Sequence, residues 1–351
     1  NSPNAEEGGT GDLYRDKLTG FGISDVINYD QIESITLRLG DNDDDLLIRS
    51  TIEGTTTVKA GGSSVDGKDV INIVSISGKT VILGEDGKDV IGVNYDRSGQ
   101  TGYSGIASTL DVRGNKGSDE YLIGLSATNT ATIDINDDDS SNSGTDSVQI
   151  FGNNDDNLFL FRANSKETAA RKAFVASYEV DDDLNPVLGG FFERVNYDSE
   201  IEAISVNGRS GNDTFVFDDT LSNLIVHGGK GDDSFQLGQV YESARDDMNP
   251  TNGLDISDYF ETTQTTRGFL SNGISESANL HGGEGNDSFV VYSNKAEVFL
   301  FGEDGDDAFL VRAFVRVDKS DPKAPWTNIN GGQGADFVSY TLNAPVNIDG
   351  G

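Results

Sequence analysis

The chain has no cysteine among its 351 residues. Disulfides, zinc–thiolate sites and thiol catalysis are therefore excluded. The sequence also has no apolar run long enough to span a bilayer and no signal-peptide pattern. We expect a fragment of a longer repetitive protein with no membrane span. If such a protein is extracellular, bound metal would take the place of disulfides as the stabilising cross-link.

Basic residues are scarce: 25 lysines and arginines stand against 60 acidic residues, which gives a net charge of −35. Nucleic acid and anionic membrane surfaces need a basic footprint, so neither is an expected partner. So large a charge repels itself in the compact state, and divalent cations are the natural counter-charge. A solvated acidic surface is the alternative. That alternative explains the total charge but not the placement of aspartate behind glycines.

Hydrophobic residues make up only 35% of the chain, which also has six prolines but 43 glycines. Low hydrophobicity with high charge is typical of disorder. Apolar residues nevertheless recur in short strand-like runs, for example at 204–206, 215–217 and 224–226. Regular runs bounded by glycine-rich turns indicate a folded, all-β chain with few helices.

A glycine–aspartate turn between two short strands recurs along the sequence. The full pattern G-G-x-G-x-D occurs at 228–233, 282–287 and 331–336, and the looser G-x-x-G-x-D at 84–89, 114–119, 208–213 and 302–307. Chance would produce roughly one copy rather than seven. A large apolar residue commonly follows two positions after the aspartate, and this pattern is the signature of a calcium-binding parallel β-helix. We therefore predict an elongated parallel β-helix, or β-solenoid, with glycine–aspartate calcium turns and long loop excursions.

Calcium takes six to eight oxygen ligands from carboxylates and carbonyls. Neighbouring coils stack about 4.8 Å apart, and two carboxylates near 4 Å repel by roughly 4 kcal/mol unless a cation lies between them. We predict several Ca²⁺ ions at these turns. The alternative is a metal-free turn in which aspartate caps backbone amides. The predicted aspartate ligands are Asp89, Asp119, Asp213, Asp233, Asp287, Asp307 and Asp336. The predicted glycines are Gly84, Gly208, Gly211, Gly228, Gly229, Gly231, Gly282, Gly283, Gly285, Gly302, Gly305, Gly331, Gly332 and Gly334.

Two spacings predict the organisation of the coils. Asp213 and Asp233 are twenty residues apart, as are Asp287 and Asp307. Twenty residues hold about three short strands, or one coil, so the sites are expected to form one column. At a larger scale, 26–37 resembles 195–206, which predicts two tandem solenoid units, 1–187 and 188–351. The segment 238–279 is predicted to be a projecting excursion.

These turns resemble the repeats-in-toxin, or hemolysin-type, calcium-binding repeats of very large secreted or surface proteins. The resemblance covers the seven turns well and the excursions poorly. It implies an extracellular or cell-surface location, folding triggered by calcium, and a structural, adhesive or filament-forming role. Implied partners are calcium, further copies of similar repeats assembling end to end, and a glycan or surface ligand. The twenty-residue coil departs from the shorter repeat of the family.

An enzyme of the polysaccharide lyase or epimerase type is the alternative, since these enzymes also use parallel β-helices. The two histidines, His227 and His281, occupy the same repeat position, which favours a structural role. No G-x-S-x-G, H-E-x-x-H or phosphate-loop motif is present. We predict no catalytic residues and a non-enzymatic module. A carbohydrate-binding or carbohydrate-cleaving β-helix stays open as the second hypothesis.

Overall fold

The computed structural model describes residues 8–62, 67–126, 128, 130–137, 144–164, 172–179, 187, 190–241, 260–312, 325–341 and 344–351. The described residues form strands and turns, and none of them forms a helix that could cross a membrane. The strands are arranged in long, mainly parallel sheets, which confirms the predicted all-β parallel solenoid.

The chain divides into two compact units. Unit 1 comprises Asn1–Phe151 and Phe191–Ala203, and unit 2 comprises Gly152–Gly190 and Ile204–Gly351. The predicted tandem halves, 1–187 and 188–351, come from sequence similarity and remain a prediction. Of the predicted excursion 238–279, residues 242–259 lie outside the described part of the chain.

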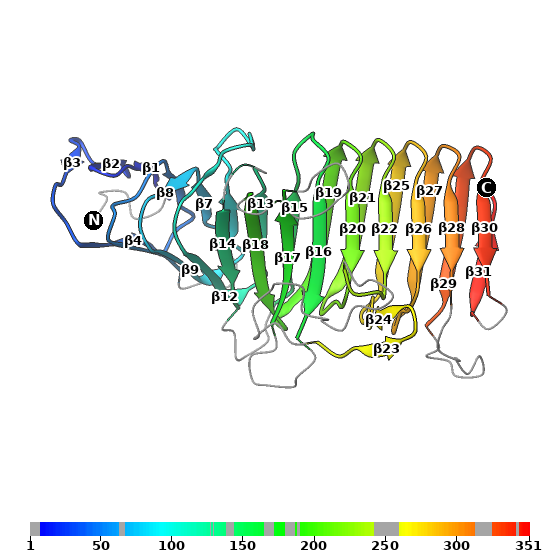
Figure 1. Cartoon of the computed structure of the whole chain (residues 1–351). Coiled ribbons are helices and arrows are strands. Elements are labelled where there is room, and N and C mark those ends of the chain that lie inside the picture. Colours follow the sequence, from blue (N-terminus) through cyan, green and yellow to red (C-terminus); the bar gives the residue numbers. More distant parts are fainter. Residues whose placement is uncertain are drawn as a thin grey trace. The chain divides into compact units, whose positions relative to one another are not determined.

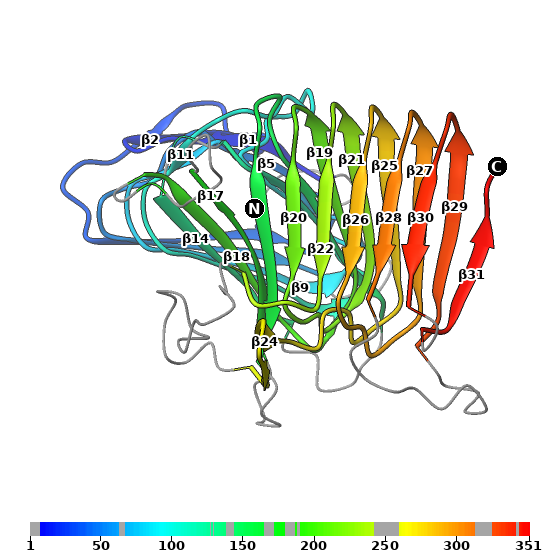
Figure 2. The same cartoon turned by 45° about the vertical axis from the view of Figure 1, so that its right-hand side comes forward.

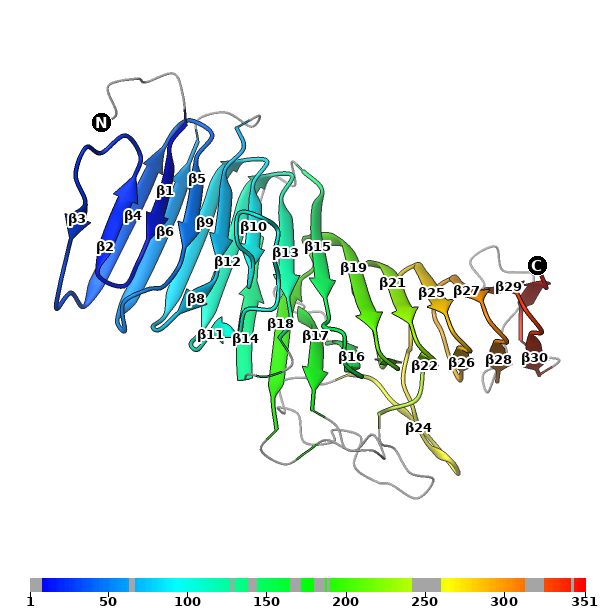
Figure 3. The same cartoon turned by 90° about the horizontal axis from the view of Figure 1, so that it is seen from above.

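Unit 1 contains two rows of parallel strands, and Figure 3 shows β6, β9 and β12 of the first row side by side. The first row is β4 (Ser34–Gly40), β6 (Thr55–Gly61), β9 (Thr80–Gly87), β12 (Leu110–Gly117), β14 (Thr130–Ile135) and β18 (Phe192–Asp198). The second row is β1 (Thr10–Leu13), β5 (Asp45–Ile48), β7 (Val70–Ile73), β10 (Val90–Val93), β13 (Glu120–Gly124) and β15 (Asp146–Phe151). Antiparallel strands β2 (Lys17–Gly20) and β3 (Ile27–Asn28) edge the second row, and β8 (Ser75–Ile76) pairs with β11 (Gly105–Ile106).

Unit 2 also has two rows, and Figures 1 and 2 show its successive strands as regularly spaced arrows. The first row is β19 (Ile201–Ser210, in unit 2 from Ile204), β21 (Asn223–Lys230), β25 (Ala278–Glu284), β27 (Val298–Asp304), β29 (Thr327–Gln333) and β31 (Val346–Asp349). The second row is β17 (Lys172–Tyr178), β16 (Leu158–Ala163), β20 (Thr214–Phe217), β22 (Ser234–Leu237), β26 (Ser288–Val291), β28 (Ala308–Val311) and β30 (Phe337–Tyr340), of which β17 alone is antiparallel. The excursion contributes a hairpin, β23 (Thr263–Thr265) and β24 (Gly268–Leu270).

Each glycine–aspartate turn joins a strand of one row to a strand of the other. The twenty-residue coil from Asp213 to Asp233 contains two strands, β20 and β21, rather than the three that we expected. The third piece, 218–222, connects the two sheets as a mostly buried bend without strand pairing. Its buried Asp218 is paired with the buried Arg162 at 2.6 Å, and the Asp218 N–H donates to the carbonyl oxygen of Phe161 at 2.9 Å. A buried charge pair and single backbone hydrogen bonds therefore fix this connector.

The core of each unit is built from the apolar residue two positions after the turn aspartate. After four of the five turn aspartates of unit 2 this residue is a fully buried phenylalanine, and Phe215, Phe235, Phe289 and Phe309 stack with ring centroids 4.5 to 4.9 Å apart. After the fifth, Asp336, it is the half-buried Val338. In unit 1 it is Leu46, Ile71, Ile91, Tyr121 or Val148, all buried and in register. The period-two alternation of the motif therefore places the aspartate and this residue on the same inward side.

Candidate metal centre

The first glycine of the motif is required because the aspartate side chain lies against it. A Cβ built on Gly228 would lie 2.1 Å from Asp233 Oδ2 and 2.6 Å from the carbonyl oxygen of Gly282 in the next coil. At all seven turns, the corresponding distance to the turn's own aspartate oxygen is 2.0 to 2.4 Å. Any side chain at this position would displace the carboxylate.

The later glycines are required for backbone conformation. Gly229 and Gly231 have φ angles of +115° and +122°, in the region that favours glycine. The second position tolerates other residues in the looser turns: Glu85, Asn115, Arg209 and Glu303 adopt φ of 75°, 70°, 80° and 77° there. A turn without the paired glycines therefore still forms, because a non-glycine residue adopts the positive φ angle at the second position.

The aspartates form a hydrogen-bonded column that we call the inner ladder. In it, the backbone N–H of each turn aspartate donates to the Oδ1 of the aspartate in the next coil. In unit 2 the ladder runs Asn157, Asp213, Asp233, Asp287, Asp307 and Asp336, with N···O distances of 2.7 to 3.1 Å. In unit 1 it runs Asp44, Asp69, Asp89, Asp119 and Asp146, with distances of 2.6 to 2.9 Å. The single expected column is thus two ladders, one in each unit.

Six of the ladder aspartates have an unsatisfied second carboxylate oxygen. The Oδ2 atoms of Asp89, Asp213, Asp233, Asp287, Asp307 and Asp336 are buried and accept no hydrogen bond. Each lies beside the first glycine of its turn, and in several coils that same space is bordered by the carbonyl oxygen of the next coil's glycine. A buried oxygen without a donor is costly, so this space calls for a proton or a cation.

The environment of the ladder raises the pKa of its carboxyl groups. Burial is the largest cause; the N–H donors lower each pKa again, and the charge of neighbouring aspartates raises it. The pKa rises to about 8 for Asp213, to about 7 for Asp89, Asp233 and Asp287, and to about 6 for Asp69. The pKa of Asp307 is also raised, by burial first. Near neutral pH the folded chain therefore resists carrying this row of negative charges.

The residue before each turn aspartate forms a second column, the outer ladder, that we did not predict. Its side-chain oxygen accepts the N–H of the equivalent residue in the following coil. In unit 2 it runs Asp156, Asn212, Asp232, Asn286, Asp306 and Ala335, with distances of 2.7 to 2.9 Å. Its side chains are exposed. Aspartate and asparagine alternate, so no two carboxylates are adjacent along it.

Whether a metal fits can be judged from the donors at the turns. Among the described residues, no three acidic or histidine side chains converge on one point. Side chains alone therefore do not build a metal site here. The available donors are one unsatisfied carboxylate oxygen per turn and glycine carbonyls from two coils. These are hard oxygen donors of the type that Ca²⁺ takes, so the donor chemistry fits calcium if the backbone contributes most ligands.

One predicted site differs from the others. At the turn 114–119, the hydroxyl of Tyr121 accepts the N–H of Gly114 at 2.7 Å and lies close to the Asp119 carboxylate. Burial raises the pKa of Tyr121 well above its ordinary value, so its hydroxyl keeps its proton. At this turn the phenol of Tyr121 occupies the region that a glycine carbonyl oxygen borders at other turns. Asp119 is therefore the least suitable of the predicted calcium ligands.

Three members of the unit 1 ladder are not among the predicted ligands: Asp44 and Asp146 were missed, and Asp69 was left out although the sequence shows its turn, Gly67-Lys68-Asp69. None follows an intact glycine motif. Their signal is weaker: each stands two positions before a buried apolar residue, as Asp44 does before Leu46. The neighbouring Asp45 is not part of the ladder and pairs with Arg97.

The two histidines lie in neighbouring strands outside the ladder. The rings of His227 and His281 stack at 4.7 Å, and His281 also stacks on Phe301 at 4.6 Å. His281 Nδ1 is 2.7 Å from Glu303 Oε1. This arrangement continues the repeat on the outward face of β21, β25 and β27.

Comparison with protein-family models, with curated proteins and with solved structures finds no match to this chain.

Proposed function

We propose that this chain is a non-enzymatic, calcium-binding structural module of a large extracellular adhesin, surface-layer or filament-forming protein. Calcium would fold and stiffen it. The motif resemblance to repeats-in-toxin proteins supports the extracellular location and the structural role. Calcium and similar repeats are the partners that follow from this proposal, and no catalytic residue is part of it.

The observation that carries the proposal is the contrast between the two ladders of unit 2. In the exposed outer ladder, asparagine separates the carboxylates. In the buried inner ladder, five aspartates follow one another from Asp213 to Asp336 without a break. Repulsion between adjacent carboxylates is stronger in the buried row, where water screens it less. A cation bound along the inner ladder removes this cost.

The residues that would hold calcium are the ladder aspartates with an unsatisfied Oδ2 and the glycines beside them. Bound Ca²⁺ supplies positive charge to a buried anionic row. The chain itself fixes each carboxylate through the backbone N–H on Oδ1, and the absence of a side chain at the first glycine leaves room for the second, buried oxygen. A site with Kd of about 10⁻⁴ to 10⁻³ M adds roughly 0.4–1.4 kcal/mol at about 1 mM calcium, so several sites together add several kcal/mol.

The test is far-UV circular dichroism with thermal melting in chelator, in millimolar calcium and in matched magnesium. We expect calcium to raise the melting temperature sharply and magnesium to do so weakly, because magnesium demands a compact octahedral shell. Equal stability in chelator and calcium would sink the calcium proposal. The turns would then be ordinary corners, and the carbohydrate-binding alternative would take precedence.

A further inference from the structure

Both histidines of the chain lie together on the outward face of unit 2. The sequence contains only His227 and His281, one on each side of the excursion. Strands β21 and β25, adjacent in Figure 1, pair in parallel with these two residues directly opposite each other. Their rings stack with centroids 4.7 Å apart and planes inclined by 24°. The fold thus brings the only two imidazoles of the sequence side by side.

The repeat position that the histidines occupy does not itself require histidine. It is the residue before the first glycine of each turn, and it is half-buried in all seven turns. The seven occupants differ in size and charge: Leu83, Arg113, Asn207, His227, His281, Phe301 and Asn330. Because this position accepts aliphatic, basic, amide and aromatic side chains, packing alone does not explain two histidines in adjacent coils.

Glu303 and Phe301 orient the ring of His281. Glu303 Oε1 lies 2.7 Å from His281 Nδ1, and Phe301 stacks on His281 from the next coil at 4.6 Å. A carboxylate at Nδ1 holds a neutral imidazole in the tautomer that has its lone pair on Nε2. Apart from this contact, the ring nitrogens of the two histidines have no hydrogen-bond partner among the described residues. Each ring therefore has a nitrogen to offer to a ligand.

We propose that His227 and His281 bind one transition-metal ion of the Zn²⁺ or Cu²⁺ class, with Glu303 as a positioning residue. The ligands are Nε2 of His281 and one ring nitrogen of His227. No three acidic or histidine side chains converge in the described part of the chain, so water completes the shell. The rings are nearly parallel, and each turns about its terminal torsion, which is broad in histidine, to reach a shared ion.

This site is separate from the inner ladder and goes beyond the calcium proposal. Imidazole nitrogen suits zinc and copper, whereas calcium takes oxygen ligands. The ion acts as a clip: β21 and β25 are neighbours in the sheet, but residues 231–277 lie between them in the sequence. Metal that binds both strands only in the folded chain stabilises the pairing that closes this long connection.

The first test follows the imidazole signals of the full chain by nuclear magnetic resonance during a zinc titration in excess calcium. Only two histidines contribute to this region of the spectrum. We expect both to shift or broaden together and to stop changing at one equivalent of Zn²⁺, while matched magnesium changes neither. The proposal is overturned if zinc affects neither histidine or only one of them. A failure of the calcium proposal is a different result, since it is read from stability in chelator.

Asparagine variants remove the nitrogen ligands and keep the turn, because Asn207 and Asn330 occupy the same position in other coils. His227→Asn and His281→Asn should each weaken zinc binding, measured by calorimetry, by at least about tenfold. The double variant should melt like the unmodified chain in calcium alone but lose the rise in melting temperature that zinc adds. Equal zinc affinity in the double variant and the unmodified chain would rule the site out.

Glu303→Gln tests the positioning role. It should weaken zinc binding about tenfold, because the carboxylate that orients His281 is lost. The nitrogen chemical shifts of His281 should report a changed tautomer, which a merely structural role of Glu303 does not predict. Glu284→Gln is the matched control, since this exposed carboxylate on β25 pairs with Lys230 at 2.6 Å. Equal zinc affinities of the two variants would contradict the role of Glu303.

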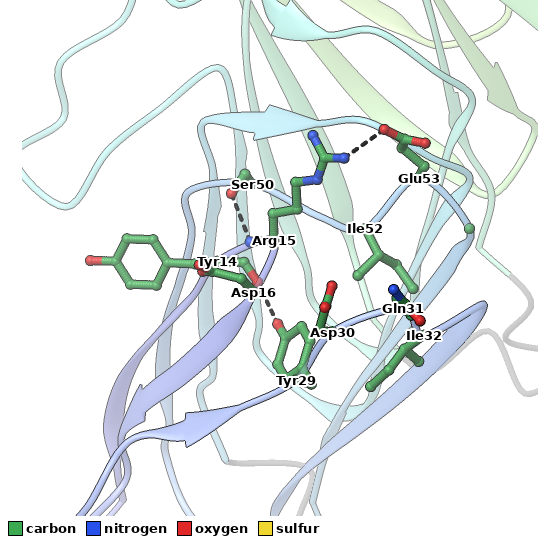
Figure 4. A pocket seen from close by; sticks show the side chains of 11 residues that line it. Tyr14, Arg15, Asp16, Tyr29, Asp30, Gln31, Ile32, Ser50, Ile52 and Glu53 are labelled. Atoms are coloured by element: carbon green, nitrogen blue, oxygen red, sulfur yellow. Dashed lines mark hydrogen bonds and ion pairs between the residues drawn. The ribbon is translucent and has the colours of Figure 1, made fainter.

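A cleft in unit 1 supplies the control for zinc held by carboxylates alone. Figure 4 shows Asp16, Asp30 and Glu53 around it, and no histidine lines it. Asp30→Asn should therefore leave the zinc affinity of the chain unchanged. A loss as large as that of His281→Asn would assign the bound zinc to oxygen ligands and overturn the proposal.

Discussion

The inner and outer ladders of unit 2 pass through the same turns, yet their residues follow different rules. Asp232 and Asp233 are adjacent in sequence, and each belongs to a ladder with similar hydrogen-bond lengths. In the exposed outer ladder, where water screens charge, asparagine still stands between successive aspartates. Inside, where repulsion is stronger, asparagine occurs only at the first position, Asn157. The inner ladder thus keeps negative charges at the positions where repulsion between them is strongest. Asparagine could accept the same hydrogen bond, so the hydrogen bond alone does not explain why aspartate stands there.

The largest expected effect is a pH dependence of the metal-free protein. The ladder carboxyls have raised pKa values in the folded state, so the folded chain binds protons more tightly than the unfolded chain. This stabilisation is complete below the ordinary aspartate pKa and is lost as pH rises through about 6 to 8, the range of the ladder pKa values. In chelator, the melting temperature should fall by several degrees from pH 5.5 to pH 8.5. Calcium should abolish the fall, and a flat profile in chelator would mean that the inner ladder is not the strained element.

Gly228→Ala should have the next largest effect. Its methyl group would collide with the Asp233 carboxylate and the Gly282 carbonyl, which removes both ladder contacts at this coil. We expect a loss of about 3 kcal/mol in the free energy of unfolding, measured by denaturant titration in calcium. Gly124→Ala is the matched control, since the nearest atom to its Cβ is 3.4 Å away. Equal losses in the two variants would contradict the steric argument.

The effect of Asp233→Asn on stability should have opposite signs in chelator and in calcium. In chelator the amide removes a buried charge and donates towards the Gly282 carbonyl, so we expect about 1 kcal/mol of stabilisation. In calcium the variant loses a ligand and should be less stable than the unmodified chain. Asp232→Asn, one residue away in the outer ladder, should be neutral in both media. Melting curves of both variants and the unmodified chain, recorded in chelator and in calcium, measure these effects. An Asp233→Asn effect of the same sign in both media would mean that the Asp233 carboxylate is not a metal ligand.

The smallest effect is expected for Asn286→Asp, which breaks the outer alternation. It places three exposed carboxylates, at 232, 286 and 306, in consecutive coils. We expect at most about 0.5 kcal/mol of destabilisation at low salt, and none at high salt, because exposed charges are screened. A larger or salt-independent loss would show that the outer ladder is less solvated than its exposure indicates.

Much of the turn could be predicted from the sequence because its chemistry is local. The seven motif aspartates all lie beside their glycines, and the residue two positions later is buried in most of them. Asp44 and Asp146 were missed, and Asp69 was left out of the predicted ligands, because these residues join the ladder through stacking and not through an intact glycine motif. The split into two ladders and the two-strand coil depend on which strands pair across long separations, and no local pattern encodes that pairing.

The separation along the chain between partners of the inner ladder is variable. It is 20 residues from Asp213 to Asp233 but 54 from Asp233 to Asp287, while the hydrogen bond stays at 2.7 to 2.8 Å. The turn sets the spacing of the coils, and a longer connection between turns costs only a small closure entropy. Foreign sequence should therefore be accepted on the side of the coil away from the turns. That makes this solenoid a scaffold on which enzymes, epitopes or binding peptides could be displayed at fixed intervals.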